Sequence, residues 1–322
     1  MWAHRLVAPG VFGAVEVPTP KEADLAPGGV LLRTLAGGIC GSDLPRFRGQ
    51  KNAVAGPRGE FTPGRPGFPM HEVVGEVVAS RHPEVEIGSR VVGWAANSDG
   101  IAEYVITDGE QLNVYARRFD PLSAVLIQSL ACVLYALERV PVADRNVAIL
   151  GVGPIGALFA HVAKDQGALR VTGIDPVDRT SLSPLLGFDD TITTTSGNWA
   201  ENLAEGERPH VTIEAVGHQV ATLAHAICGT APEGTVLYFG IPDDDIYPVN
   251  MESLMRKNLA LVGGVTRDRR RSLANADQYL QKHPELYGAI VTHELDRGSI
   301  QEAYDLANLP AVNRMKVVLS LA

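Results

Sequence analysis

The sequence predicts an α/β protein of two unequal parts, a mostly β domain and a domain with a doubly wound parallel sheet. From Val30 to about Asn113, short segments rich in β-branched residues alternate with Gly/Pro turns, which indicates the β part. From Asn146 onward, strand and helix patterns alternate, which predicts a parallel sheet with helices on both faces. A chain of 322 residues with 45% hydrophobic content is long enough for two cores.

The order of the predicted elements follows from these patterns. In the β part we expect strands at residues 30–35, 73–79, 90–92 and 102–107. Leu, Val and Ala at helical spacing over residues 122–138 predict a helix, and the Gly/Pro-rich residues 49–69 predict a long loop. The alternating part contains expected strands and helices at residues 147–150, 155–166, 171–174, 211–215, 220–228 and 235–239.

Composition narrows the possible partners and location. The net charge of -9 argues against nucleic acid as a partner. Three cysteines (Cys40, Cys132 and Cys228) form an odd, sparse set, which argues against a disulfide framework and predicts the reducing cytoplasm. Residues 1–10 show no export signal. The longest apolar run, residues 147–160, contains Gly and Pro and is shorter than the roughly 20 residues of a spanning helix, so no membrane is expected.

A cysteine and a histidine suggest a metal site. Cys40 lies in Gly-Ile-Cys-Gly-Ser-Asp (residues 38–43), and His71-Glu72 follows in another short apolar stretch. Thiolate and imidazole suit zinc, and a catalytic zinc takes three protein ligands and keeps one open position. A lone buried cysteine or histidine is more often a core residue, but the two together, with Ser42 and Asp43, favour ligation. The third ligand stays open at this point.

A glycine loop predicts a dinucleotide site. An apolar strand runs into a G-x-G-x-x-G motif and then a helical pattern, and the alternative is a glycine-rich turn without cofactor. The predicted binding residues of the loop are Gly151, Gly153, Pro154, Ile155 and Gly156. Asp175 ends the next strand near the offset of roughly 20 residues expected for the ribose-binding carboxylate. It favours NAD, whereas Arg179 leaves NADP possible because arginine can bind a 2′-phosphate.

Taken together, these motifs resemble the zinc-type medium-chain alcohol and polyol dehydrogenases, with the glucose, sorbitol and threonine dehydrogenases as the nearest type. The matching segments are residues 38–43, 71–77, 88–91, 151–156, 214–217 and 240–242, in the order of the family along nearly the whole chain. The resemblance implies an irregular β-rich, GroES-like catalytic domain, residues 1–129 and 265–322. It also implies an inserted Rossmann domain, residues 130–264.

The resemblance also implies roles for individual residues. Cys40 and His71 would be zinc ligands with catalytic function, Glu72 an alternate or outer ligand, and Asp43 would orient His71. Ser42 would accept the proton of the substrate hydroxyl. The implied reaction is zinc-assisted hydride transfer between NAD(P) and a secondary alcohol or ketone of a small molecule. The implied cofactor site further includes Gly217, Gly240 and Ile241.

Several positions depart from the family pattern. Gln128 stands where many relatives have the glutamate of a Glu-Pro-Leu-Ala run, although archaeal glucose dehydrogenases look similar with glutamine. An amide oxygen can bind zinc but contributes less charge, and Cys132 is a weaker substitute. No cluster of four cysteines lies near residues 93–107, so one catalytic zinc and no structural zinc are expected. Pro45 replaces a frequent relay histidine, and Met70 replaces a glycine.

Basic residues suggest the substrate class. Arg46, Arg48 and Lys51 belong to a loop, residues 46–65, that links the two metal-ligand segments, and a positive field there suits a phosphate or carboxylate on a sugar or polyol. The alternative is a solvated loop. A second basic cluster, residues 267–271, fits a cleft or a subunit surface.

Two other functions remain open. One is a zinc-free reductase of activated C=C bonds, and the other is a catalytically inactive dinucleotide-binding protein. The strand-like residues 259–262 fit the family's habit of joining sheets, so we expect a homodimer or homotetramer.

Overall fold

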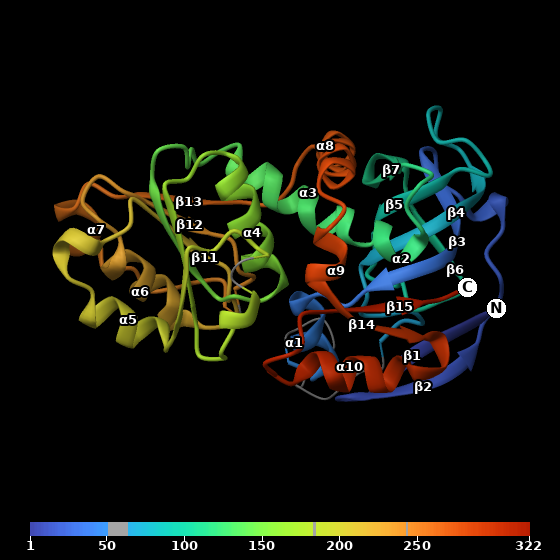
Figure 1. The fold of residues 1–322 in the computed structure, drawn as a ribbon. Coiled ribbons are helices and arrows are strands. Elements are labelled where there is room, and N and C mark those ends of the chain that lie inside the picture. The colour runs from blue at the N-terminus through green and yellow to red at the C-terminus, as the bar shows by residue number, and fades with distance from the viewer. Residues whose placement is uncertain (51–63, 183–184, 243) are drawn as a thin grey trace. The chain divides into compact units, whose positions relative to one another are not determined.

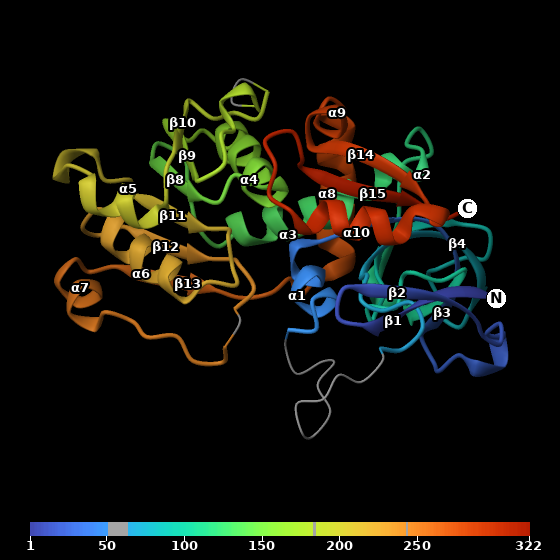
Figure 2. The same cartoon turned by 90° about the horizontal axis from the view of Figure 1, so that it is seen from below.

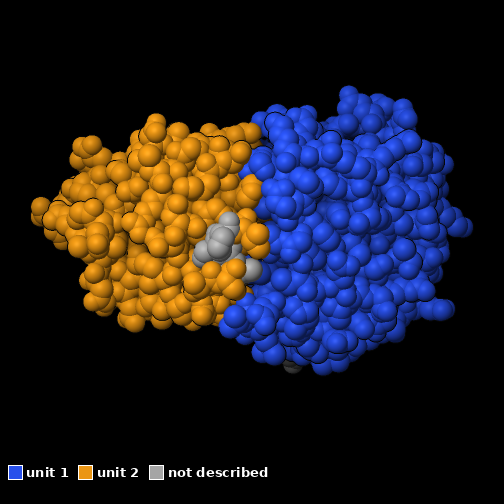
Figure 3. All heavy atoms as spheres, in the orientation of Figure 1, with its two compact units in different colours: residues 1–131, 267–322 blue, residues 132–266 orange. Residues whose placement is uncertain are grey.

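The computed structural model describes residues 1–50, 64–182, 185–242 and 244–322 (Figure 1). The chain forms two compact units, which Figure 3 shows in two colours. Met1–Ala131 and Arg267–Ala322 make the β-rich unit, and Cys132–Thr266 make the parallel-sheet unit. The predicted fold class is confirmed. Within the described residues, no helix has both the length and the apolar character needed to cross a membrane.

One sheet and one separate hairpin build the β-rich unit. The sheet has the strand order β14-β15-β3-β4-β5-β7, with β6 paired to β3. Its strands are β3 (Gly29–Gly38), β4 (Glu72–Ser80), β5 (Arg90–Trp94), β6 (Tyr104–Asp108), β7 (Leu112–Val114), β14 (Val291–Asp296) and β15 (Lys316–Ser320). The hairpin joins β1 (Trp2–Ala8) and β2 (Val11–Glu16). All four strands predicted in this part of the chain are present, and β15 brings the end of the chain against β3 (Figure 1).

The helices of this unit are α1 (Leu44–Phe47), α2 (Pro121–Ala124), α8 (Arg269–Lys282), α9 (Leu286–Ile290) and α10 (Ile300–Asn308). A further helix, α3 (Leu126–Leu137), begins in this unit and ends in the parallel-sheet unit. The helix predicted over residues 122–138 is therefore divided at Val125 into α2 and α3. Asp120 caps α2 by accepting a hydrogen bond from the Ser123 amide, which fixes where it begins.

The arginines at the start of α8 attach that helix to the β-rich unit. The Arg269 guanidinium lies 4.9 Å from the centre of the Trp94 ring and donates to Gln111. Arg270 forms an ion pair with Glu84. The charged groups of Arg269 and Arg270 are thus both paired within the β-rich unit.

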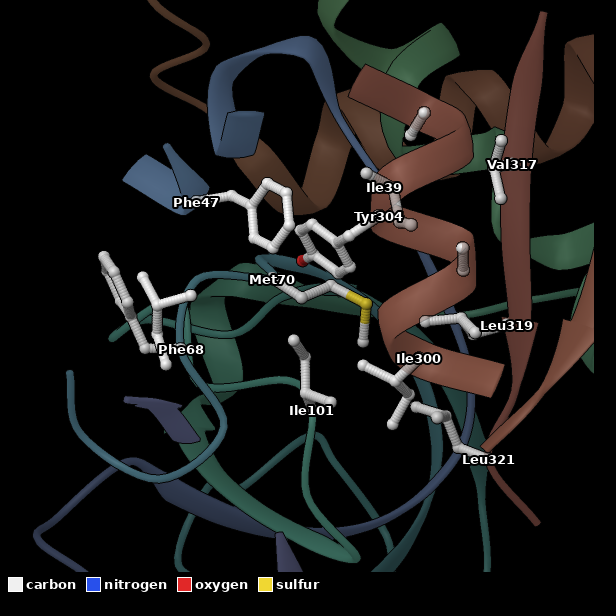
Figure 4. Packing of buried hydrophobic residues seen from close by; sticks show 13 residues of the cluster. Ile39, Phe47, Phe68, Met70, Ile101, Ile300, Tyr304, Val317, Leu319 and Leu321 are labelled. Carbon is white, nitrogen blue, oxygen red and sulfur yellow. The ribbon is translucent and has the colours of Figure 1, made fainter. Parts of the chain in front are cut away.

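A buried core surrounds Met70, the residue before His71. Met70 is fully buried, and Figure 4 shows it beside Tyr304, Ile101 and Ile300. A Cβ atom at Gly37 would overlap the Met70 thioether, so the missing side chain of Gly37 gives Met70 its space. This close packing explains how the methionine is accommodated at this position, and it fixes the backbone next to His71.

The second unit contains a parallel sheet with the order β10-β9-β8-β11-β12-β13. Its strands are β8 (Asn146–Leu150), β9 (Arg170–Asp175), β10 (Asp190–Thr193), β11 (Val211–Glu214), β12 (Thr235–Tyr238) and β13 (Ala260–Gly263). The order reverses between β8 and β11. In open α/β sheets, ligands bind outside the carboxyl ends of the strands at such a reversal.

Helices cover both faces of this sheet. They are α4 (Pro154–Asp165), α5 (Ser196–Asn202), α6 (Val220–Gly229) and α7 (Met251–Arg256). Ala148 and Leu150 pack into the cluster that includes α5 and α6, whereas Gly156 of α4 faces Ile149. Because alternate residues of a strand point to opposite faces, α4 lies on the face opposite to α5 and α6 (Figure 2).

Candidate functional site

The register between two antiparallel strands brings the candidate metal ligands together. Cys40 follows the end of β3, His71 directly precedes β4, and Gly38 pairs with Glu72 across the two strands. The possible ligand atoms of Cys40, His71 and Glu72 all lie within 4.8 Å of one another. A Cβ atom at Gly38 would overlap the Glu72 carboxyl, so glycine is required where that side chain passes over β3. A sulfur, an imidazole nitrogen and a carboxylate at this spacing are a donor set that suits zinc.

Asp43 holds both candidate ligands in place. It is fully buried at the end of the 3₁₀ helix Gly41–Asp43, and Cys40 immediately precedes this helix. One carboxylate oxygen lies 2.7 Å from His71 Nδ1, and the other accepts the Cys40 amide at 3.0 Å. With Nδ1 engaged, Nε2 is the imidazole nitrogen that is left for a metal.

The environment of His71 favours positive charge. Burial disfavours the charged imidazole, but the Asp43 carboxylate and the Cys40 sulfur outweigh burial and raise the pKa of His71 well above its usual value. The groups that favour a proton on this ring are the groups that would favour a metal cation there.

Glu72 lies in a buried ion pair that the sequence did not reveal. The Lys316 ammonium lies 2.7 Å and 2.5 Å from the two carboxylate oxygens, and the Ser129 hydroxyl donates to the first at 3.1 Å. The side chains of Glu72 and Lys316 are 1% and 3% exposed. Burial alone would lower the pKa of Lys316, but the Glu72 carboxylate reverses this and raises it. The only signal in the sequence is a lysine within the apolar run of β15.

The other sequence-derived candidates in this region differ in their surroundings. Gln128 is 3% exposed and lies in the first turn of α3, next to the Ser129 that contacts Glu72. Ser42 is half-buried and lies between the Gly41 and Asp43 of the 3₁₀ helix. Ser42 thus lies on the short helix that follows Cys40, and Gln128 lies on the helix whose Ser129 contacts Glu72.

The basic residues proposed for an anionic substrate have internal partners. Arg46 donates to the Ser98 hydroxyl at 2.9 Å and lies over the Phe68 ring. Arg48 donates to the Asn308 side chain at 2.6 Å, which ties α1 to α10. Lys51 lies outside the described residues, as does most of the long loop predicted at residues 49–69. Arg46 and Arg48 are therefore the two described candidates for an anion contact, and each already has a side-chain partner.

The glycine loop has the shape that a diphosphate requires. Gly151 adopts a positive φ of 90°, which favours glycine, and a Cβ atom at Gly156 would overlap the Gly151 carbonyl. Gly153 caps α4, with Pro154 at the first position of the helix. A Cβ atom at Gly153 would have no neighbour within 4 Å among the described residues. The backbone at Gly153 and the start of the helix, where Ile155 follows, are thus open to an anion.

Asp175 lies directly beside this loop. Its two carboxylate oxygens accept the amides of Val152 and Val177, each at 2.8 Å. Arg179 is buried nearby; burial lowers the pKa of its guanidinium, and the Asp175 carboxylate opposes that shift. Asp175 and Arg179, the two residues expected to influence the preference between NAD and NADP, thus interact with each other.

Two further loops carry the remaining cofactor candidates. Gly217 lies in the loop after β11, and Gly240 and Ile241 lie in the loop after β12. The His218 amide donates to the Ile241 carbonyl at 2.8 Å, so the loops are in direct contact. They extend the glycine loop's surface at the carboxyl ends of the parallel strands.

Comparisons with known proteins show which families and structures the chain resembles. Residues 26–117 match the alcohol dehydrogenase GroES-like domain, and residues 154–282 match the zinc-binding dehydrogenase family. L-threonine 3-dehydrogenase of Pyrococcus horikoshii is 26% identical over 95% of both chains. D-altritol 5-dehydrogenase of Agrobacterium fabrum is 28% identical over 92% of both. The crystal structure of a short chain alcohol dehydrogenase from E. coli CFT073, complexed with NADH, has a TM-score of 0.80 at 20% identity and covers 100% of this chain and 99% of that one.

Proposed function

Because the chain belongs to the zinc-type medium-chain dehydrogenases, NAD(P)-dependent oxidoreductases that act on CH–OH groups, we propose that it oxidises a secondary alcohol of a polyol or sugar derivative. The observation that carries this proposal is the group of Cys40, His71 and Glu72 with Asp43 behind it. The relatives named for D-altritol and L-threonine support a small polar alcohol as the substrate class.

The residues of the β-rich unit have separate tasks in this proposal. Cys40 and His71 hold one catalytic zinc ion, and Gln128 contributes its amide oxygen in place of the usual glutamate. Asp43 positions His71, and Lys316 holds Glu72 as an outer carboxylate that balances charge. Bound zinc would supply Lewis-acid polarisation of the substrate oxygen. Ser42 would accept the hydroxyl proton and pass its own proton outward to solvent.

The residues of the parallel-sheet unit bind the dinucleotide. The amides at Gly153 and the first turn of α4 receive the diphosphate, and Asp175 receives the adenosine ribose. We assign NAD as the preferred cofactor, because the Asp175 carboxylate disfavours a 2′-phosphate and Arg179 is engaged with it. NADP remains the second cofactor to test.

A substrate screen with metal analysis tests the proposal. Purified protein should contain about one zinc per chain and should reduce NAD with at least one of a set of polyols, sugars, sugar phosphates and L-threonine. Chelation should remove both zinc and turnover. Full activity in metal-free protein would refute zinc assistance. Reduction of an enone after chelation would point to the zinc-free C=C reductase, and NAD binding without any turnover would point to an inactive binding protein.

Arg46 is expected to bind the anionic group of the substrate. If the substrate carries phosphate or carboxylate, Arg46→Gln should raise KM by about tenfold with little change in kcat, since the ground state and transition state lose the same contact. Steady-state kinetics with a sugar phosphate and its unphosphorylated parent measure the effect. Arg48→Gln shows whether the second described arginine of the loop contributes to the same contact. Equal KM changes for both substrates would contradict an anion contact.

We also propose that the chain is a homodimer or a higher homo-oligomer in the cytoplasm. β13 pairs only with β12 among the described strands, and Leu261 on it is 42% exposed. An unpaired apolar edge strand is a common site for sheet extension by a second copy. Sedimentation velocity of the purified protein measures the state.

A further inference from the structure

Glu214 is a buried carboxyl at the place where the parallel sheet binds ligands. It is the last residue of β11 and is 0% exposed. β11 lies next to β8, whose end opens the glycine loop, and the strand order reverses between them. Burying a carboxyl is costly unless its oxygens have hydrogen-bond donors. The contacts of this side chain therefore indicate what it does.

The donors to Glu214 come from the loop that follows its own strand. One carboxyl oxygen accepts the amides of Val216 at 3.2 Å and Gly217 at 3.0 Å. The second oxygen has no hydrogen bond of normal geometry within the described residues, although the Thr222 hydroxyl and the Gly240 amide lie near the carboxyl. Burial raises the pKa of Glu214, and these neutral donors oppose the rise. These donors belong to loop backbone and to the start of α6.

Glu214 also contacts the loop after the neighbouring strand β12. Its backbone carbonyl accepts the amides of Phe239 at 2.9 Å and Gly240 at 3.0 Å. A Cβ atom at Gly240 would overlap both the Gly217 backbone and the Glu214 carboxyl. Gly217 has a positive φ of 63°, and a Cβ atom there would crowd Ile241. The two loops can lie this close because both positions are glycine, and the Glu214 carboxyl lies against both of them.

We propose that Glu214 is a positioning residue for dinucleotide binding, which fixes the loop of residues 215–219 against the loop of residues 239–242. The proposal rests on the proposed function, since it takes the dinucleotide as the ligand of these loops. An apolar side chain would leave the Val216 and Gly217 amides without an acceptor, a loss of about 1–3 kcal/mol for each buried group. Loops that lose these bonds can relax away from the geometry that the cofactor needs.

Binding of NADH to the full-length protein tests this role. Glu214→Leu should raise the Kd for NADH, measured by fluorescence titration, at least about tenfold. Glu214→Gln should raise it less, because its carbonyl oxygen can still accept both amides. The matched control is Thr212→Val, two residues earlier on the same face of β11, where Thr212 is fully buried and contacts Thr230 at 2.7 Å. Zinc content should stay unchanged in all three variants.

The outcomes separate positioning from a merely structural role. A structural role would lower the melting temperature in Glu214→Leu and Thr212→Val alike while leaving the Kd within twofold of wild type, and that result overturns the proposal. If Glu214→Leu does not fold, Glu214→Gln and Gly240→Ala decide, and unchanged NADH affinity in both is a refutation. Wild-type protein that binds NADH but oxidises no alcohol refutes the proposed function and leaves the Glu214 comparison intact.

Discussion

Cys40→Ala is expected to remove the zinc ion and to lower turnover by at least about 10³-fold. Lewis-acid polarisation is worth several kcal/mol of barrier, and each 1.36 kcal/mol is a factor of ten in rate. Cys40 supplies the one thiolate of the described group, and the Glu72 carboxylate is already paired with Lys316, so no second anionic ligand is free to replace the thiolate. Metal analysis and initial rates on the same protein sample measure the two losses together.

The control for this variant is Cys228→Ala, which removes an exposed cysteine of the parallel-sheet unit. It should keep both zinc and turnover. Asp43→Asn gives an intermediate case, because the loss of an outer hydrogen-bond partner costs about 10–100-fold in metal affinity or activity. NADH affinity should remain at the wild-type value in Cys40→Ala, since the dinucleotide loop lies in the other unit. Substantial alcohol oxidation by metal-free Cys40→Ala would refute the assigned chemistry.

Local motifs predicted those parts of the site whose residues are close in the sequence. Cys40 and Asp43 are three residues apart, and the glycines of the 151–156 loop all belong to one turn. In both cases the spacing alone indicates the local geometry. Strands with regular β-branched patterns were predicted for the same reason. The hairpin of β1 and β2 was missed because only Ala3 and Leu6 of β1 are buried, which gives no alternating pattern.

Contacts between distant residues could not be predicted in this way. Lys316 lies 244 residues from Glu72, and only the pairing of β15 with β3 brings the two together. The carboxyl of Glu214 belongs to a matched family segment, but its role depends on how two loops pack. Charge counts pointed to Arg46 and Arg48, but their partners Ser98 and Asn308 lie far from them in the sequence and are visible only in the structure. Partner identity is a property of tertiary packing, which a single sequence does not show.

Lys316→Met is expected to destabilise the zinc-free protein by about 3–5 kcal/mol, because it leaves the buried Glu72 carboxylate without its cation. The Ser129 hydroxyl remains as a donor to one oxygen but cannot balance the charge. Urea unfolding midpoints of wild type and variant measure the loss. The double variant Glu72→Gln with Lys316→Met should recover most of it, since no uncompensated charge is then buried.

The same variant separates two roles for Glu72 when zinc is added. If Glu72 is an outer carboxylate, as its pairing with Lys316 favours, zinc should stabilise wild type and Lys316→Met by similar amounts. If Glu72 is instead a metal ligand, the metal should replace the missing ammonium, and zinc should stabilise Lys316→Met far more than wild type. The control is Thr34→Val, which removes a buried hydroxyl of β3 that donates to the Ala102 carbonyl, so a polar group is lost but no charge.

A destabilisation below about 1 kcal/mol for zinc-free Lys316→Met would contradict an ionic pair between Glu72 and Lys316.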